Sequence, residues 1–432
     1  MRRTILAWAA GALLAPSAAG AQDAGAMVEA IMGDGGDALF AEAWKLDEAG
    51  EDAKAARLYR EAAERGHVVA MNNLAVMNIE GEGIPVDVEE GLRLYRAAVE
   101  AGSAQAAYNL GQHHQEGDLV ERDMDEAVRL YALGADQDHP RALNALGYLY
   151  DHGEHVAEND ALALDLFRRA AELGDAQGQF NLGVMYDFGE GVAQDRAEAA
   201  RWYDLAAKQD QRNALNNLAV LYEEGDGVEQ DWEVATLLYS RAAELGHRGS
   251  QFAYAYALDE GLGVEIDDPA AAEWYAKAAG QGHPIAAYNL ALMLENGEGI
   301  PVDHEAALRL YLQAGEDDHI TGLYNAAVLL HQSDRLEPDE ARARTLYERA
   351  ARLGSGDARN NLGWMLWKGM GGEADPIAAW AWLTLAAEDE AVANARGNLE
   401  ALEESMSAIE VIRARRALRA LRAKLATADE EG

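Results

Sequence analysis

The chain has 432 residues and no cysteine, and its 76 acidic residues outnumber 36 basic ones, for a formal net charge of −40. The lack of cysteine excludes disulfide bonds and thiolate chemistry, and the length is enough for two or three domains. Nucleic-acid binding depends on lysine and arginine that neutralise phosphates, so the charge argues against nucleic acid and favours a basic partner. An apolar fraction of 49% is too high for a disordered acidic chain.

The N-terminus has the parts of a secretory signal. Arg2 and Arg3 form a positive start, the apolar stretch to Leu14 is too short to span a bilayer, and Ala19-Gly20-Ala21 offers small residues for cleavage. We therefore expect residues 1–21 to be a cleaved signal peptide and the protein to be periplasmic or secreted. An ordinary buried first helix is the alternative. The sequence contains no second long apolar run, so it predicts no membrane span.

Internal repeats with a period of 36 residues organise the rest of the chain. One register is mostly leucine: Leu74, Leu110, Leu146, Leu182, Leu218, Tyr254, Leu290, Ala326 and Leu362. A second register is mostly glycine: Gly81, Gly117, Gly153, Gly189, Gly225, Gly261, Gly297, Ser333 and Gly369. A third is mostly tyrosine: Tyr59, Tyr95, Tyr131, Phe167, Tyr203, Tyr239, Tyr275, Tyr311, Tyr347 and Leu383. Three registers that agree over nine units predict a repeat protein.

Each unit is predicted to form two antiparallel helices. In the unit from Ala176, the first helix should end near Asp187, because Gly189 and Gly191 can take positive φ and turn the chain. Asp195 then stands where its carboxylate can cap the second helix. Apolar residues of that helix share one face at three- and four-residue spacing. One such hairpin cannot bury its own apolar face, whereas a stack of them forms a continuous core.

These residues carry a family resemblance. In the unit from Ala176, Asn181-Leu182-Gly183, Tyr186, Gly189, Gly191-Val192, Asp195 and Trp202-Tyr203 resemble the Sel1-like repeat, a relative of the tetratricopeptide repeat. The resemblance covers residues 68–391 and implies an all-α, α/α superhelical solenoid of helix pairs. It also implies an adaptor or regulator, often outside the cytoplasm in bacteria. A cysteine-rich branch is associated with β-lactams, but its disulfide-linked helix pairs are absent here.

The segments around the nine repeats are predicted to be a linker and caps. Residues 22–36 are rich in glycine and alanine and read as a linker, and residues 37–67 as a degenerate helical hairpin. Residues 392–432 should form capping helices that cover the last repeat, followed by an acidic tail. Six basic residues lie in 411–424. Either they face the acidic body of the same chain, or they make peripheral contact with an anionic membrane surface or an acidic partner.

No catalytic motif is present: H-E-x-x-H, S-x-x-K, G-x-S-x-G, the P-loop and the Rossmann fingerprint are all missing. Five histidines share one register at the loop between units, which indicates loop and cap residues: His67, His139, His247, His283 and His319. Four others are off this register and leave a transition-metal site as the alternative: His113, His114, His152 and His155. No further ligand type at fixed spacing supports that alternative. We therefore expect a non-enzyme without cofactor or metal.

Candidate partner-binding residues lie on the first helices. By analogy with the tetratricopeptide fold, residues one, two and five before the leucine register, and two and five after it, face a concave groove. The position before that leucine carries a ladder of amides that includes Asn181, Asn217, Asn289 and Asn325. The preceding position carries aromatics that include Phe180, Phe252, Tyr288 and Tyr324. The asparagines either tie helices together or bind an extended peptide backbone; for the aromatics, packing is the favoured interpretation.

Two further aromatics depart from their registers. Trp367 stands where most repeats carry aspartate or glutamate, and Trp232 stands at the polar start of a second helix. We expect both to be exposed and to mark an interface. The sequence therefore favours a scaffold that binds a protein or peptide in the groove. A cell-wall enzyme or a small-ligand binder, such as a β-lactam-binding protein, is the alternative.

Overall fold

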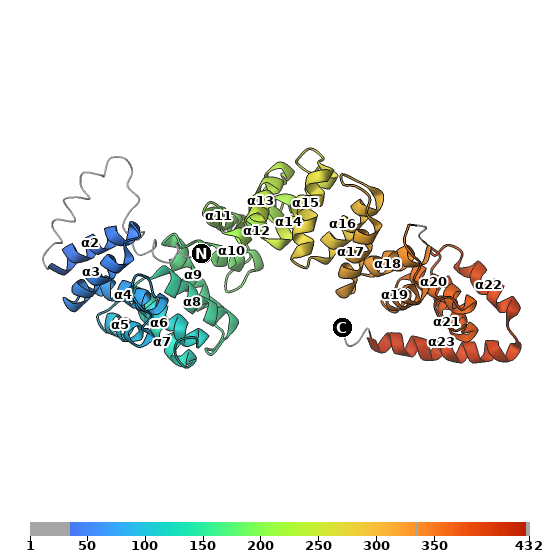
Figure 1. The fold of residues 1–432 in the computed structure, drawn as a ribbon, viewed down its shortest axis with the longest axis horizontal. Coiled ribbons are helices and arrows are strands. Elements are labelled where there is room, and N and C mark those ends of the chain that lie inside the picture. Colours follow the sequence, from blue (N-terminus) through green and yellow to red (C-terminus); the bar gives the residue numbers. More distant parts are fainter. Residues whose placement is uncertain (1–34, 333–334, 429–432) are drawn as a thin grey trace. The chain divides into compact units, whose positions relative to one another are not determined.

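The computed structural model describes residues 35–332 and 335–428, and throughout these ranges its regular structure is helical, with no strand. The predicted all-α fold class is confirmed. The proposed signal peptide, residues 22–34 of the proposed linker and residues 429–432 of the tail lie outside the described residues. The helices follow one another as antiparallel pairs (Figure 1).

The helices fall into leading, first, second and closing sets. The leading pair is α2 (Gly35–Glu48) and α3 (Asp52–Glu64). The first helices of the repeats are α4 (Val68–Glu80), α6 (Ala104–Glu116), α8 (Pro140–His152), α10 (Ala176–Phe188), α12 (Arg212–Glu224), α14 (Arg248–Glu260), α16 (Pro284–Asn296), α18 (Ile320–Gln332) and α20 (Gly356–Lys368). The second helices are α5 (Val88–Glu100), α7 (Met124–Ala135), α9 (Asp160–Glu172), α11 (Arg196–Ala207), α13 (Trp232–Glu244), α15 (Asp268–Gly280), α17 (His304–Glu316), α19 (Glu340–Arg352) and α21 (Pro376–Ala387). The closing helices are α22 (Ala395–Ser405) and α23 (Ala408–Ala428).

The chain divides into two compact units. The first contains the chain up to Ala214 together with residues 226–228, and the second contains residues 215–225 and the chain from Glu229 onward. Within each unit, second helices pack against the first helix of their own repeat and against that of the next, as α5 does with α4 and α6 and as α15 does with α14 and α16. Alanines of the second helices are fully buried at these contacts, among them Ala242 and Ala278. Small side chains bring the helices close, which gives each repeat a core shared with its neighbours.

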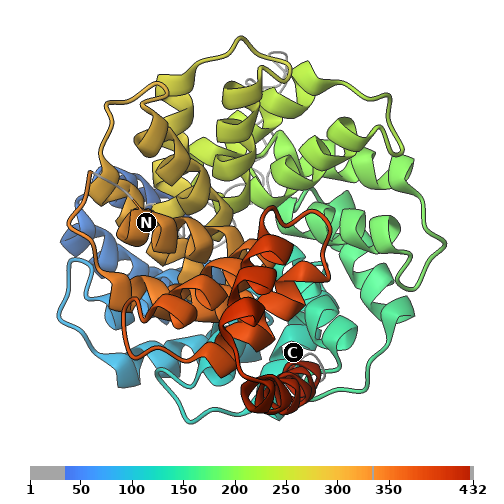
Figure 2. The same cartoon turned by 90° about the vertical axis from the view of Figure 1, so that its right-hand side faces the viewer.

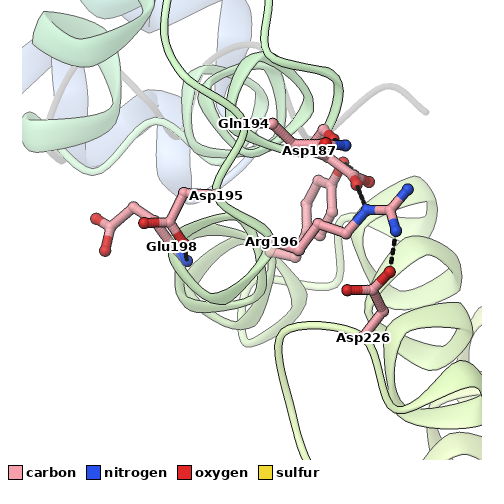
Figure 3. A network of polar contacts seen from close by, with 7 residues as sticks. Asp187, Gln194, Asp195, Arg196, Glu198 and Asp226 are labelled. Carbon is pink, nitrogen blue, oxygen red and sulfur yellow. Dashed lines mark hydrogen bonds and ion pairs between the residues drawn. The ribbon is translucent and has the colours of Figure 1, made fainter.

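Glycine and aspartate set the helix ends as the sequence predicts. Gly189 has φ of 78°, and its N–H donates to the carbonyl of Met185 at 2.9 Å, which closes α10. Asp195 accepts a hydrogen bond from the backbone N–H of Glu198 at 3.0 Å and so begins α11 (Figure 3). Equivalent side-chain caps begin the other second helices of the repeats: Asp87, Asp123, Asn159, Asp231, Asp267, Asp303, Asp339 and Asp375.

An arginine holds one of these turns in place. Arg196, the first residue of α11, donates through Nε to Asp187 at the end of α10 at 3.1 Å and forms an ion pair with Asp226 (Figure 3). Asp187 also accepts from the hydroxyl of Tyr203 at 3.2 Å. Three backbone segments therefore meet at one guanidinium, which donates several hydrogen bonds in a fixed plane.

The second glycine of each turn packs against the preceding repeat. A Cβ on Gly263 would lie 2.1 Å from the carbonyl oxygen of Trp232, which is part of the backbone and cannot rotate away. A Cβ on Gly261 would meet the side chain of Ile266 at 3.0 Å. The φ angles of the two glycines are nearly equal, at 68° and 70°. Gly261 is therefore needed mainly for the positive φ of the turn. Gly263 is needed for the close backbone contact between repeats as well.

The five histidines in the loop register cap the first helices, as predicted. Nδ1 of His139 accepts from the backbone N–H of Ala142 at 3.2 Å, while Nε2 lies 3.0 Å from the amide oxygen of Gln105. The proton must therefore be on Nε2, and Nδ1 must be free to accept. Burial lowers the pKa of His139 to about 4, and the positive charge of Arg141 acts in the same direction. The ring also stacks on Tyr108, with 5.4 Å between centroids.

The closing helices cover the last repeat. Both α22 and α23 pack against α21, and α23 runs alongside it (Figures 1 and 2). Ala414 and Leu418 of α23 and Leu402 of α22 are buried with Trp380 of α21. The indole N–H of Trp380 donates to the carboxylate of Glu403 at 2.8 Å. An apolar stripe that would otherwise face water is thereby buried.

Replacing the two glycines of one turn with alanine should have unequal effects. Gly261→Ala should cost about 1 kcal/mol, because a Cβ is disfavoured at positive φ. Gly263→Ala should cost about 1–3 kcal/mol more, because the Cβ also meets backbone that must shift. Urea unfolding of both variants measures the difference. Equal losses would mean that the contact between repeats adapts without strain.

His139 should make the fold sensitive to acid. Because its pKa is lowered on folding, its contribution to stability is present above the unfolded value near 6.5 and is lost as the pH falls toward 4. The loss should reach up to about 3 kcal/mol. His139→Ser should keep a cap, as Ser103 does in the preceding loop, and should lose less stability over the same pH range. Identical pH profiles for the two proteins would contradict this assignment.

Candidate binding surface on the first helices

The amides of the ladder link neighbouring first helices. Asn181 on α10 donates to the amide oxygen of Asn144 on α8 at 2.8 Å, and it accepts from the amide of Gln177 at 2.9 Å. Asn109 on α6 donates to Asn72 on α4 in the same way, at 3.1 Å. These residues occupy the positions one, two and five before the leucine register. Together with the residues two and five positions after that register, they form one face of the first helices. We call this face the first-helix surface.

Asparagines of the ladder also reach the buried tyrosines. Asn289 donates to the hydroxyl of Tyr275 at 3.0 Å, and that hydroxyl donates to the carboxylate of Asp259 at 3.1 Å. Burial raises the pKa of Tyr275 and also that of Asp259. Asn289 therefore contributes to packing, which is one of the two roles considered for the ladder. Its role in binding stays a prediction.

The other ladder asparagines are half-buried and are also engaged. Asn325 interacts with the hydroxyls of Tyr288 and Tyr311, an interaction that lowers their pKa against the larger effect of burial. Asn217 accepts from the amide of Asn216 at 3.3 Å.

The predicted aromatics line the same surface and are half-buried. Phe252 lies over the core Tyr275, with 6.0 Å between ring centroids, and stacks on the capping His283 at 4.5 Å. Tyr288 has corresponding contacts with Tyr311 and His319. Phe180 lies 5.9 Å from Tyr203, and Tyr324 lies 5.9 Å from Tyr347. Each ring packs against its own repeat with one face.

The expectation that Trp232 and Trp367 are exposed is wrong, since both are half-buried. Trp367 packs against the core of the last repeat and meets Trp364 edge-on, with 5.3 Å between ring centroids. The ammonium of Lys368 lies 3.4 Å from the centre of the Trp367 ring. The start of α13, where Trp232 lies, is covered by the loop that contains Gly263. These contacts thus bury part of each tryptophan ring, although the positions that the two residues occupy are polar in most other repeats.

A pocket of about 540 Å³ opens on the first-helix surface between α8 and α10. We call it the α8–α10 pocket, and it is lined by Gln115, Asn144, Ala145, Tyr148, Asp151, His152, Phe167, Gln177, Phe180, Asn181, Val184, Met185 and Glu190. Phe180 and Asn181 were predicted from the sequence, whereas Tyr148, Asp151, His152 and Glu190 were missed. The signal that could have revealed them is the departure of Phe167 from the tyrosine register.

The basic residues of α23 lie on its outer side. Arg413, Arg415 and Arg416 are exposed, as is the apolar Ile412 beside them. Arg422 forms an ion pair with Glu388 at the end of α21, so one of the basic residues does face the body of the same chain. Peripheral contact through residues 411–424 stays a prediction.

Over residues 35–332 and 335–428, no three histidine or acidic side chains are grouped so that they could hold a metal ion. His113 instead lies 3.0 Å from a carboxylate oxygen of Asp118. No helix in the described part of the chain has the length and apolar character that crossing a membrane requires.

Comparison with known proteins gives the family. Ten segments match the Sel1 repeat: residues 51–67, 68–103, 104–139, 140–175, 176–211, 212–247, 249–283, 284–319, 320–355 and 356–389. A search of curated proteins finds no match. Sel1 repeats are commonly protein-interaction scaffolds and are typically non-enzymatic.

Solved structures agree with this match. A protective antigen of uropathogenic Escherichia coli with the same type of repeat fold is 27% identical, with a TM-score of 0.60 over 92% of this chain and 94% of that chain. A Sel1 repeat protein from Oxalobacter formigenes is 30% identical, with a TM-score of 0.53 over 72% of this chain and 90% of that chain. From the ten matched segments and these shared folds, it follows that this chain belongs to the Sel1 repeat family.

Proposed function

We propose that the chain is a non-catalytic scaffold of the cell envelope whose first-helix surface binds an extended, basic segment of a partner protein. The observation that carries this proposal is exposed aromatic surface beside the amide ladder. Tyr148 and Tyr256 are each 41% exposed, and both lie two residues after the leucine register. Tyrosine combines a large apolar ring with a polar tip, which is why it is enriched at protein interfaces.

The amides support binding to an extended segment. Asn181 is half-buried, and beyond its bonds to Asn144 and Gln177 its amide has a further donor and a further acceptor position for a peptide backbone. Such bonds do not depend on the partner's side chains. Phe180 and Phe252, which pack against their own repeats with one face, would supply apolar contacts beside the amides.

The charge of the chain supports a basic partner. The first helices end on a recurring acidic register five residues after the leucine position, namely Asp151, Asp187, Glu223, Asp259 and Glu295. This register adjoins the amides, and the whole chain carries a net charge of −40. Carboxylates arranged in this way would steer a basic segment toward the surface and make its association rate fall as salt is added.

One pair of exposed tyrosines tests the surface. Tyr148→Ala combined with Tyr256→Ala should weaken capture of the partner from the native envelope by about tenfold or more, because truncated interface aromatics often cost over 1 kcal/mol. The melting temperature should hardly change, since both rings are exposed.

Leu237 on α13 provides the control, because it is 69% exposed but lies on a second helix. Leu237→Ala should leave capture unchanged when the bound proteins are quantified by mass spectrometry. If Leu237→Ala weakens capture and the tyrosine variant does not, the binding surface is on the second helices instead.

Export is the other part of the proposal. The mature protein should begin at Gln22, because the small residues at positions 19 and 21 fit a signal-peptidase site. N-terminal sequencing of protein recovered from the periplasm or the medium measures this. Finding only the intact chain that begins at Met1, in the cytosol, would contradict an envelope role.

A further inference from the structure

The α8–α10 pocket lies in a repeat that combines an amide, at a position where five of the nine repeats carry an aromatic ring, with a phenylalanine in the tyrosine register. In the neighbouring repeat, Tyr108 lies over the core Tyr131, with 5.9 Å between ring centroids. In the repeat that starts at Pro140, the corresponding residues are Asn144 and Phe167. Both residues line the pocket between α8 and α10, where an amide and a phenyl ring stand in place of two tyrosines.

The second change leaves a carboxylate without its usual donor. In other repeats the core tyrosine donates to the residue at the end of the first helix, as Tyr203 does to Asp187 and Tyr311 does to Glu295. Phe167 has no hydroxyl, so it cannot donate to Asp151, which stands in the same register. The side chain of Asp151 is only 20% exposed, and one of its oxygens lies 3.0 Å from Nδ1 of His152.

Further acidic groups surround this carboxylate. A second hollow of about 410 Å³ joins Asp151 and His152 to Glu158, Asp160 and Glu190. Burial raises the pKa of Asp151, and the negative charges of Asp160 and Glu158 raise it further. Burial and the charge of Asp151 raise the pKa of Glu190. Asp151 and Asp160 are half-buried, whereas Glu158 and Glu190 are exposed. Carboxylates that repel one another are stabilised when a cation binds between them.

Aromatic rings form part of the remaining lining, beside amide and aliphatic side chains. The ring of His152 stacks on Tyr148, with 4.0 Å between centroids and 23° between planes, and this pair forms a flat surface. Phe180 lines the pocket from α10. Among the described residues that line it there is neither lysine nor arginine. A ligand that fits must therefore donate hydrogen bonds, carry positive charge and have a flat face.

We propose that the α8–α10 pocket receives the guanidinium of an arginine in the partner's extended segment. A guanidinium is planar, donates up to five hydrogen bonds and stacks on aromatic rings, whereas an ammonium has no flat face. Asp151 and Glu190 accept its hydrogen bonds, and Tyr148 stacks on it. This inference rests on the proposed function, since it names the residue that the first-helix surface recognises.

Isothermal titration of the purified protein with acetyl-Gly-Arg-Gly-amide tests the pocket directly. The same peptide with citrulline is the neutral control, because citrulline keeps the shape and loses the charge. The arginine peptide should bind about tenfold or more tightly than the citrulline peptide, since hydrogen bonds between charged partners are about twice as strong as neutral ones. Equal binding of the two peptides, or of a lysine peptide and the arginine peptide, would overturn the proposal.

Variants of the repeat locate the binding. Phe167→Tyr restores the hydroxyl that other repeats have, which should occupy Asp151 and reduce affinity for the arginine peptide about tenfold without loss of stability. Asp151→Asn should reduce it similarly, because it removes a charge. Asp204→Asn is the charge-matched control, since Asp204 pairs with Lys208 on the second helix α11 and does not line the pocket; it should leave affinity unchanged.

The outcomes separate this inference from the proposed function. If Phe167→Tyr and Asp151→Asn bind the arginine peptide as well as the unchanged protein does, the pocket is not an arginine site. Partner capture that still depends on Tyr256 would then leave the scaffold proposal standing. Loss of peptide binding in Asp204→Asn as well would also overturn the inference, because binding would follow net charge and not the pocket.

Discussion

The buried tyrosine that most second helices carry is the constraint on which the repeat geometry depends. Its ring fills the space between the two helices of a pair, and its hydroxyl must find a partner, because an unpaired buried hydroxyl is costly. Tyr275 meets this need with Asp259 on one side and Asn289 of the next repeat on the other. One hydroxyl thus connects three helices, which explains why acid, tyrosine and asparagine recur together.

The same constraint determines which residues remain for binding. A carboxylate that accepts a hydrogen bond from a buried tyrosine uses part of its hydrogen-bonding capacity within the fold. The same holds for an asparagine that donates to such a tyrosine. The aromatics two residues after the leucine register are not engaged in this way, as the exposure of Tyr148 and Tyr256 indicates. A partner would therefore gain most from these rings and from the remaining hydrogen-bonding capacity of the amides.

Much of the fold could be predicted from the sequence because its signals are local. The first helix of the unit from Ala176 was expected to end near Asp187, and it ends at Phe188. The glycine at its C-terminus and the aspartate before the next helix act through backbone atoms a few residues away. The site was less predictable, because exposure and empty volume depend on neighbouring repeats. The half-burial of Trp367 follows from the packing of the last repeat, and no periodicity shows it.

Because the chain is built from repeats, a comparison of equivalent positions within the chain can separate structural roles from binding roles. A residue that keeps its type at each period answers a need that each repeat has, as the capping aspartates do. A residue that departs from the register answers either a local packing need or a function. His331 answers a local packing need. It stands in the acidic register, and its ring meets Tyr347 edge-on, with 6.1 Å between the ring centroids. Phe167 has no such packing partner among the described residues to explain it: its departure leaves Asp151 beside an open pocket with His152 3.0 Å away, which is why we assign it to binding in the proposal above.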